Sequence, residues 1–193
     1  MTIYHKNLID HQNRASIIAD LGKLIKEEAP WFVPRMKSGA AFKYKMSNAG
    51  KYGWISDEKG YRYVEKNPYT GKPWPKIPNS ILAIVQQLMD RQIIPGNFKA
   101  ESMLINQYLP GESLALHQDN SEENRAAPII SISLGCPGVF LLGGTRRSDA
   151  VKEIILEPGD VFVMSGKSRM KFHGFKGIIR GEKRINLTIR QVY

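Results

Sequence analysis

The sequence predicts a mainly β fold, a jelly roll or small barrel, preceded by two helices. After residue 101, short apolar or alternating runs follow one another, and Pro-Gly or Gly-Gly pairs separate several of them. Helical periodicity is confined to the first half of the chain. The 193 residues, 42% of them hydrophobic, can form one domain with a buried core. We therefore expect a single domain over residues 1–193, with a β-rich core from residue 103.

Two helices are expected where apolar residues recur every three to four positions. These stretches are Arg14 to Glu28 and Ser80 to Gln92. Asn79 or Ser80 can cap the start of the second helix. Glycines punctuate the segment between the helices, which predicts short hairpins and loops there.

Eight strands are expected in the second half of the chain, at a spacing typical of a jelly roll or small barrel. They are Met103–Tyr108, Leu114–Gln118, Ile129–Leu134, Val139–Leu142, Glu153–Leu156, Asp160–Met164, Arg169–Phe172 and Ile185–Val192.

Composition excludes several classes of protein. No apolar run approaches the roughly 20 residues of a membrane helix, and the N-terminus lacks the apolar segment of a signal peptide. The single cysteine, Cys136, excludes an internal disulfide and is typical of a reducing compartment. We therefore expect a cytoplasmic, monomeric protein without a membrane partner.

The positive charge is concentrated in one segment. The net charge is +10, and residues 35–76 hold ten Lys or Arg against three Asp or Glu, which is +7. The same segment carries eight of the 18 aromatic residues. Basic side chains interleaved with rings favour a nucleic-acid partner, although basic proteins without one are common.

A candidate metal site comes from the few histidines. His117 and Asp119 stand two positions apart, so on a strand both side chains point to one face. Adding His173 gives the two imidazoles and one carboxylate of non-haem Fe(II) oxygenases, which leave three positions open. A bidentate keto acid and O₂ can take those positions. A His-x-Asp pair alone is more often an ordinary surface pair, so both interpretations stay open.

The last predicted strand alternates strictly from Arg184 to Arg190, with polar residues on one face and aliphatic residues on the other. Alternation alone favours a strand whose polar face is in water. Two arginines on one face can also clamp a dicarboxylate such as 2-oxoglutarate. Asn106 and Tyr108 share a face of an earlier strand and could add hydrogen bonds.

From about Met46 to Gln191, the sequence resembles the AlkB-type dealkylating dioxygenases. The resemblance rests on an ordered set of short motifs: Asn106-Gln107-Tyr108, Pro110-Gly111, His117-Gln118-Asp119, Pro128 to Gly135, Gly159-Asp160-Val161, His173-Gly174 and the Arg-x-Asn-x-Thr-x-Arg of residues 184–190. It implies a double-stranded β-helix, which is a form of jelly roll, with a nucleotide-recognition lid.

The resemblance also implies the ligands. His117, Asp119 and His173 would hold Fe(II). The far carboxylate of 2-oxoglutarate would be bound by Asn106, Tyr108 and Arg184. Asn186 and Arg190 would lie near the end that chelates iron, and Thr188 between them would complete the co-substrate site.

The basic, aromatic segment resembles the lid. An enzyme that acts on a base must hold it outside the stack, and Trp54 resembles the ring that does so, opposite the His117 imidazole. Without the resemblance, a buried core tryptophan is equally expected. The further substrate contacts that the resemblance implies are Met46, Tyr61, Arg62, Tyr63, Ser121 and Arg147. Ser121 departs from the family, because an acidic residue is usual there, which leaves the base preference open; the neighbouring Glu122 matches.

These features predict oxidative demethylation of bases such as 1-methyladenine or 3-methylcytosine, in DNA or RNA and preferably single-stranded. 2-Oxoglutarate and O₂ would be converted to succinate, CO₂ and formaldehyde. Two alternatives remain: an oxygenase acting on a protein or small molecule, and a metal-binding jelly roll that only binds nucleic acid.

Overall fold

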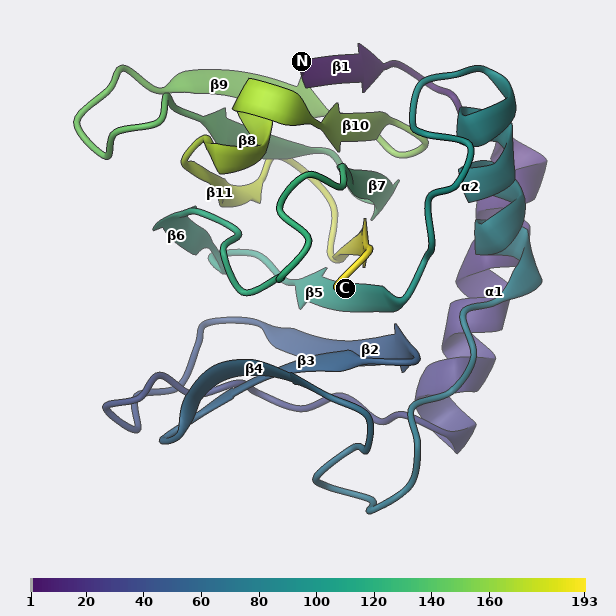
Figure 1. The fold of residues 1–193 in the computed structure, drawn as a ribbon, viewed down its shortest axis with the longest axis vertical. Helices are drawn as coiled ribbons and strands as arrows, with labels where there is room; N and C mark the ends of the chain where they lie inside the picture. Colours follow the sequence, from purple (N-terminus) through teal and green to yellow (C-terminus); the bar gives the residue numbers. More distant parts are fainter. Residues whose placement is uncertain (1) are drawn as a thin grey trace.

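A computed structural model describes residues 2–193 and shows two antiparallel sheets facing each other, with helices outside one of them (Figure 1). The larger sheet has the strand order β1-β10-β7-β12-β5-β2, and the smaller one β6-β11-β8-β9. A separate hairpin, β3-β4, lies beside β2. The sheet strands are β1 Thr2–His5, β2 Lys45–Gly50, β5 Ser102–Tyr108, β6 Leu114–His117, β7 Ile129–Gly135, β8 Gly138–Leu142, β9 Lys152–Leu156, β10 Val161–Met164, β11 His173–Ile178 and β12 Arg184–Arg190. The hairpin strands are β3 Gly53–Asp57 and β4 Gly60–Val64.

The main core lies between the helices and the larger sheet. α1, His11–Glu27, buries Ile17 and Leu21, and α2, Asn79–Asp90, buries Ile81 and Leu88. They pack with the apolar faces of β5, β7 and β12 in one cluster. The opposite faces of these strands point between the two sheets, so their polar residues are covered by the smaller sheet.

The helix boundaries correct the expected capping. α1 starts at His11 because Asp10 caps it, accepting a hydrogen bond from the Asn13 amide at 2.8 Å. At α2, neither Asn79 nor Ser80 is the cap; Pro78 occupies that position without a side-chain hydrogen bond. The Ser80 hydroxyl instead donates to Asp20 of α1 at 2.5 Å, which ties the two helices together.

One expected strand is wrong. Residues Arg169–Phe172 were expected to be extended, but a 3₁₀ helix, Gly166–Met170, occupies this region and β11 begins only at His173. Ser165 and Ser168 form a reciprocal capping box, which caps the N-terminus of the short helix. The turn also buries Arg169, which is 1% exposed. The other expected strands are present, and β1 is an additional one, paired with β10.

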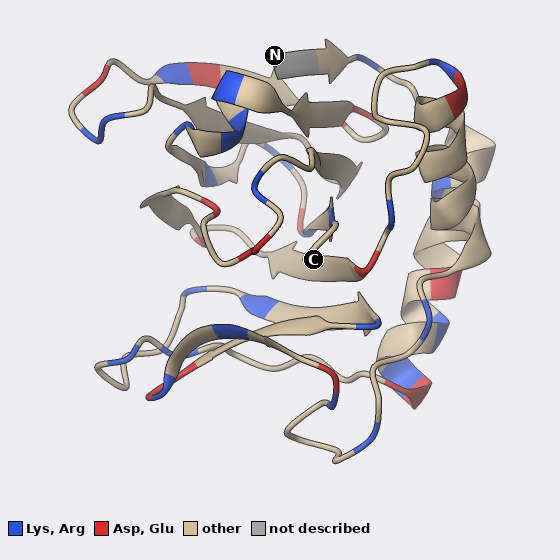
Figure 2. Cartoon of the chain, in the orientation of Figure 1, with Lys and Arg blue, Asp and Glu red and all other residues tan. Residues whose placement is uncertain are grey.

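The basic, aromatic segment forms hairpins and loops, as expected. β2 joins the larger sheet through β5, while β3 and β4 form the hairpin at its side. In Figure 2 basic positions recur along β2, β4 and the loops around them. We refer to residues 35–76 as the lid and to β3-β4 as the lid hairpin.

Candidate active site

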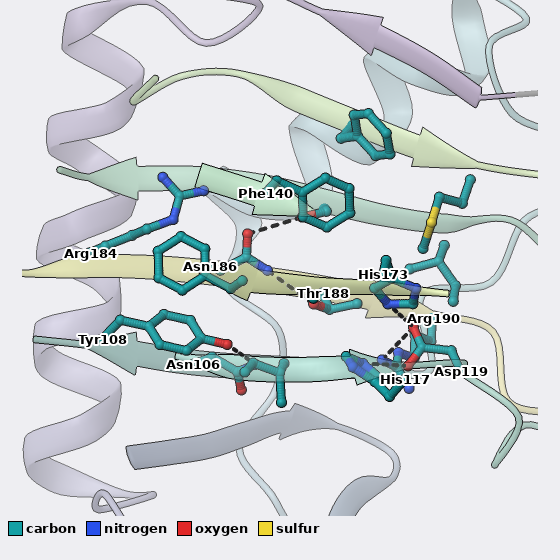
Figure 3. Close-up of a pocket in the computed structure, with 17 residues that line it drawn as sticks. Asn106, Tyr108, His117, Asp119, Phe140, His173, Arg184, Asn186, Thr188 and Arg190 are labelled. Atoms are coloured by element: carbon teal, nitrogen blue, oxygen red, sulfur yellow. Dashed lines mark hydrogen bonds and ion pairs between the residues drawn. The ribbon is translucent and has the colours of Figure 1, made fainter. Parts of the chain in front are cut away.

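A pocket between the two sheets brings together residues from distant parts of the chain (Figure 3). It contains all nine residues that the sequence analysis assigned to metal and co-substrate: Asn106, Tyr108, His117, Asp119, His173, Arg184, Asn186, Thr188 and Arg190. Figure 3 shows Arg184 and Tyr108 at one end of the pocket and the two histidines with Asp119 at the other.

The candidate metal ligands converge because two strands pair. His117 ends β6 and is the register partner of His173, the first residue of β11, while Asp119 follows in the loop after β6. One ligand atom from each of the three lies within 4.8 Å of the other two. His117 Nε2 is 3.6 Å from one Asp119 carboxylate oxygen, and His173 Nε2 is 3.4 Å from the other.

Both imidazoles are oriented by backbone carbonyls. His117 Nδ1 lies 2.9 Å from the Ala115 carbonyl oxygen, and His173 Nδ1 lies 3.0 Å from that of Lys171. A carbonyl only accepts, so each Nδ1 carries the proton and each Nε2 keeps its lone pair. Nε2 is therefore the atom of each ring that could bind a metal, with the outer hydrogen bond usual for histidine ligands.

The electrostatics keep Asp119 ready to bind a cation. Burial favours its neutral form, but Arg190 and His173 hold the pKa of the Asp119 carboxyl well below its usual range. Its Oδ2 lies 2.9 Å from Arg190 Nη2, yet without hydrogen-bond geometry. A buried carboxylate oxygen with unused acceptor capacity, beside two imidazole lone pairs, fits a divalent iron.

The open side of this centre is at His117. Its side chain is 34% exposed, whereas those of His173 and Asp119 are 9% and 6% exposed. Burial lowers the pKa of His117, but Asp119 more than offsets this effect and the pKa is raised. Of the three side chains, His117 is therefore the one that solvent reaches.

The far end of the pocket holds a buried positive charge. Arg184 is 1% exposed and has no ion pair within residues 2–193. Its guanidinium donates only to neutral groups, the Ser133 hydroxyl and two backbone carbonyls, and its Nε has no partner. Burial lowers the pKa of Arg184 to about 10, which still leaves it charged. A buried, unpaired cation fits a carboxylate ligand.

Further polar side chains line the pocket between Arg184 and the candidate metal ligands. Tyr108 faces Arg184 in the β5-β12 register, and its hydroxyl accepts a hydrogen bond from Asn106 at 3.3 Å. Asn186 and Thr188 follow on the same face of β12, where Asn186 Nδ2 donates a hydrogen bond to Thr188 Oγ1 at 3.2 Å. Residues that the sequence analysis did not assign form the remaining wall: Leu114, Ile129, Ser131, Phe140, Phe162, Met164, Gly174 and Phe175. Their strands were expected, but alternation does not say which residues face a ligand.

The lid places one aromatic pair beside the centre. Trp54 is half-buried, with its Nε1 at 3.5 Å from Ser121 Oγ, two positions after Asp119. Tyr61 is 56% exposed, and its ring centroid is 5.5 Å from that of Trp54. Trp54 is therefore not fully buried in the core; it lies next to the loop that carries the metal-binding carboxylate.

Other expected substrate residues have different surroundings. Met46 is completely buried. Arg62 is tied to Asp57 by two hydrogen bonds, at 2.7 and 2.8 Å. The Tyr63 hydroxyl donates to Glu122 rather than to an open surface. Arg147 is exposed, 5.0 Å above the Phe172 ring.

Behind the centre lies a network of buried charged side chains that was not expected from the sequence. Glu122 is 2% exposed and pairs with Arg169 at 2.6 Å and also with Arg190. Arg169 Nη1 donates to the backbone carbonyl of Asp119. The motif match at Glu122 was a signal, but nothing in the sequence indicated its partner Arg169, which was expected in a strand.

Comparisons with known proteins agree with this geometry. The model of the 2OG-Fe(II) oxygenase superfamily matches residues 1–190. The chain is 40% identical over 184 residues to the alpha-ketoglutarate-dependent dioxygenase AlkB of Salmonella typhimurium, covering 91% of this chain and 83% of that protein. It is 29% identical over 160 residues to the tRNA demethylase abh1 of Schizosaccharomyces pombe, covering 74% and 53%.

A solved structure shows the same architecture. OsALKBH1 superposes with a TM-score of 0.81 at 26% identity, covering 98% of this chain and 97% of that one. Neither helix within residues 2–193 is long and apolar enough to cross a membrane. By sequence, by fold and by its His-Asp-His centre, the chain belongs to the 2OG-Fe(II) oxygenase superfamily, in the group of the alpha-ketoglutarate-dependent dioxygenases AlkB.

Proposed function

We propose that the protein removes methyl groups from the ring nitrogens of nucleic-acid bases, of the 1-methyladenine and 3-methylcytosine type. One observation carries this substrate class: Trp54 and the exposed Tyr61 form an aromatic pair beside the open side of the metal centre. An extruded base needs a ring to stack on. The tRNA demethylase among the relatives supports the same class.

The pocket residues take the following roles. His117, Asp119 and His173 hold the iron through two Nε2 atoms and one carboxylate. Arg184, with Tyr108 and Asn106, binds the far carboxylate of 2-oxoglutarate, and Asn186, Thr188 and Arg190 line the path towards the metal. When bound, iron with 2-oxoglutarate and O₂ supplies an oxidation that hydroxylates the N-methyl carbon and releases succinate, CO₂ and formaldehyde.

The lid residues bind the nucleic acid. Trp54 stacks on the base opposite His117, and Tyr61 extends this surface. Ser121, beside Trp54, offers the base edge a neutral hydroxyl in place of a carboxylate and so bears on base preference. The exposed Arg147 and the lid lysines contact phosphates, a mode that suits single strands of DNA or RNA. The buried Met46 and the Asp57-bound Arg62 support the lid from behind.

We also infer a monomer that acts in the cytoplasm. For the cytoplasm, the basis is Cys136, the only cysteine of the sequence, which suits a reducing compartment. Size-exclusion chromatography coupled to light scattering tests the monomer, and a dimer at micromolar concentration would contradict it.

A panel of methylated oligonucleotides tests the substrate class. DNA and RNA, single and double strands, are incubated with Fe(II), 2-oxoglutarate and O₂, and loss of one methyl group is scored by mass. We expect demethylation of single strands, absent in Asp119→Ala. Turnover of 2-oxoglutarate without any demethylation would favour a protein or small-molecule substrate. Binding without any turnover would favour a non-catalytic module.

A further inference from the structure

The lid hairpin contacts the loop after β6 through two neighbouring residues. Trp54 of β3 and Tyr63 of β4 are register partners across the hairpin. Trp54 Nε1 lies 3.5 Å from Ser121 Oγ, and the Tyr63 hydroxyl donates to the carboxylate of the next residue, Glu122. Paired residues of the lid thus contact consecutive residues of the loop after β6, which carries Asp119.

Glu122 is the centre of a buried network that reaches the metal ligand. One carboxylate oxygen of Glu122 accepts a hydrogen bond from Arg169 Nη2 at 2.6 Å. The other accepts hydrogen bonds from Arg190 Nη1 and from the Tyr63 hydroxyl. Arg190 Nη2 continues to the Asp119 carboxylate at 2.9 Å, and Arg169 donates to the Asp119 backbone carbonyl. The same carboxylate therefore positions both arginines that hold Asp119.

These contacts exclude a direct role for Glu122 in reading a base. Its side chain is 1% exposed, and both oxygens are already occupied by donors. It differs in this from Ser121, which is half-buried beside Trp54. Glu122 acts on the substrate only through the residues that it holds.

The network has one member that can leave at low cost. Two arginines and two carboxylates of the network are buried, and separating any of them would leave an unpaired charge in the interior. Tyr63 is neutral and is the member contributed by the lid hairpin. Detaching its hydroxyl breaks hydrogen bonds with Glu122 and Arg190 but leaves every charge paired.

We propose that the Tyr63–Glu122 contact is a latch that holds the lid hairpin closed over the metal centre. Tyr63 and Glu122 are positioning residues: they fix Trp54 at the mouth of the pocket and, through Arg190, couple lid closure to the Asp119 ligand. The part played by Trp54 rests on the proposed function, whereas the latch itself is a property of the folded chain.

Tyr63→Phe tests the latch, since it removes the hydroxyl and keeps the ring. Hydrogen–deuterium exchange of the full chain without iron should become faster in residues 53–64 and remain unchanged in β5, β7 and β12. The matched control is Tyr69→Phe, which removes an exposed hydroxyl from the same lid and should not alter exchange in residues 53–64.

Activity measurements give a second readout. In Tyr63→Phe the KM for a methylated oligonucleotide should rise about ten- to a hundredfold, the range that corresponds to a hydrogen bond to a charged group, while the KM for 2-oxoglutarate stays the same. Succinate should form in excess over formaldehyde, because the lid no longer holds the base in place. Tyr63→Phe should have a smaller effect in a Glu122→Gln background than in the wild type, because Glu122→Gln already weakens the Tyr63 contact together with the ion pairs to Arg169 and Arg190.

Two outcomes would overturn the latch. The first is exchange in residues 53–64 and an oligonucleotide KM that both match the wild type. The second is a uniform increase in exchange with a lower unfolding temperature and an unchanged KM, which would assign Tyr63 to general stability. If Glu122→Gln does not fold, Tyr63→Phe decides alone. A wild type that demethylates nothing would refute the proposed function, while the exchange measurement would still decide the latch.

Discussion

At the scale of single residues, two arginines on one strand face have opposite surroundings. Arg190 pairs with both Asp119 and Glu122, so its charge is neutralised within the protein. Arg184, six positions earlier, donates only to neutral oxygens. The alternating pattern alone shows two equivalent arginines. The resemblance assigned Arg184 to the far carboxylate, and the fold supplies the physical reason, because of the two only Arg184 has no anionic partner among the described residues.

Arg184→Lys should therefore raise the KM for 2-oxoglutarate by at least about tenfold, because lysine keeps the charge but loses the two-pronged geometry. The measurement is succinate formation against 2-oxoglutarate concentration. Arg180→Lys, at an exposed site beside Glu157, is the matched control and should leave this KM unchanged. An unchanged KM in Arg184→Lys would remove Arg184 from the co-substrate site.

Trp54→Ala should separate base binding from co-substrate binding. It removes a stacking surface of about 1–3 kcal/mol per base, so demethylation should collapse while 2-oxoglutarate binding, followed by titration calorimetry, persists. Trp54→Phe keeps a ring and should retain part of the activity. If Trp54→Ala demethylates normally, or unfolds as a core variant would, the stacking role is wrong.

At the scale of elements, β12 shows how far the pattern reaches. Alternation from Arg184 to Arg190 supported an expected strand at Ile185–Val192. The structure confirms the strand but places it at Arg184–Arg190, so it begins one residue and ends two residues earlier than expected. The pattern also allowed the polar face of this strand to be in water, because alternation does not reveal what covers the polar face. The smaller sheet covers it, and this cover depends on pairings distant in sequence, such as His117 with His173. The 3₁₀ helix escaped prediction for a similar reason, since its Arg169 is fixed by the distant Glu122.

The lid hairpin depends on a glycine. A Cβ at Gly53 would lie 2.1 Å from the Trp74 ring, so Gly53→Ala must displace either the hairpin or the tryptophan. We expect a loss of about 1–3 kcal/mol in the free energy of unfolding, measured by denaturant titration. Gly22→Ala is the control: its Cβ meets nothing within 4 Å in α1, and it should stabilise by about 1 kcal/mol. Equal effects of the two changes would show that the close contact with Trp74 does not matter.

At the scale of the whole molecule, charge and chemistry are divided between two regions. Of the net charge of +10, +7 lies in residues 35–76, while the metal centre lies between the two sheets. The sequence predicted this division, because composition reports where charge gathers along the chain. Composition alone could not place the lid relative to the pocket, since that depends on contacts such as Trp54 with Ser121. Only the resemblance implied a position, with Trp54 opposite His117.

Salt dependence should follow this division. Alanine at Lys43, Lys45 or Lys51, all exposed, should weaken oligonucleotide binding equally across sequences and lower the slope of log K against log salt by about 0.7 per charge removed from a single-strand contact. Binding is measured by fluorescence anisotropy at several salt concentrations. Lys23→Ala on α1 removes the same charge away from the lid and should leave the slope unchanged. A slope equally reduced by Lys23→Ala would indicate a general charge effect.

The hydrogen bonds from His117 and His173 to the backbone carbonyls of Ala115 and Lys171 have a consequence for metal selection. These hydrogen bonds orient both rings through the protein's own backbone. A rigid set of two imidazoles and one carboxylate does not favour iron over its competitors, and affinity for such ligands rises along the first row towards copper. Which ion fills the centre is then decided by supply in the cell. With zinc or nickel in the centre, the lid would still bind a methylated strand. The protein would then cover the methylated base without removing its methyl group.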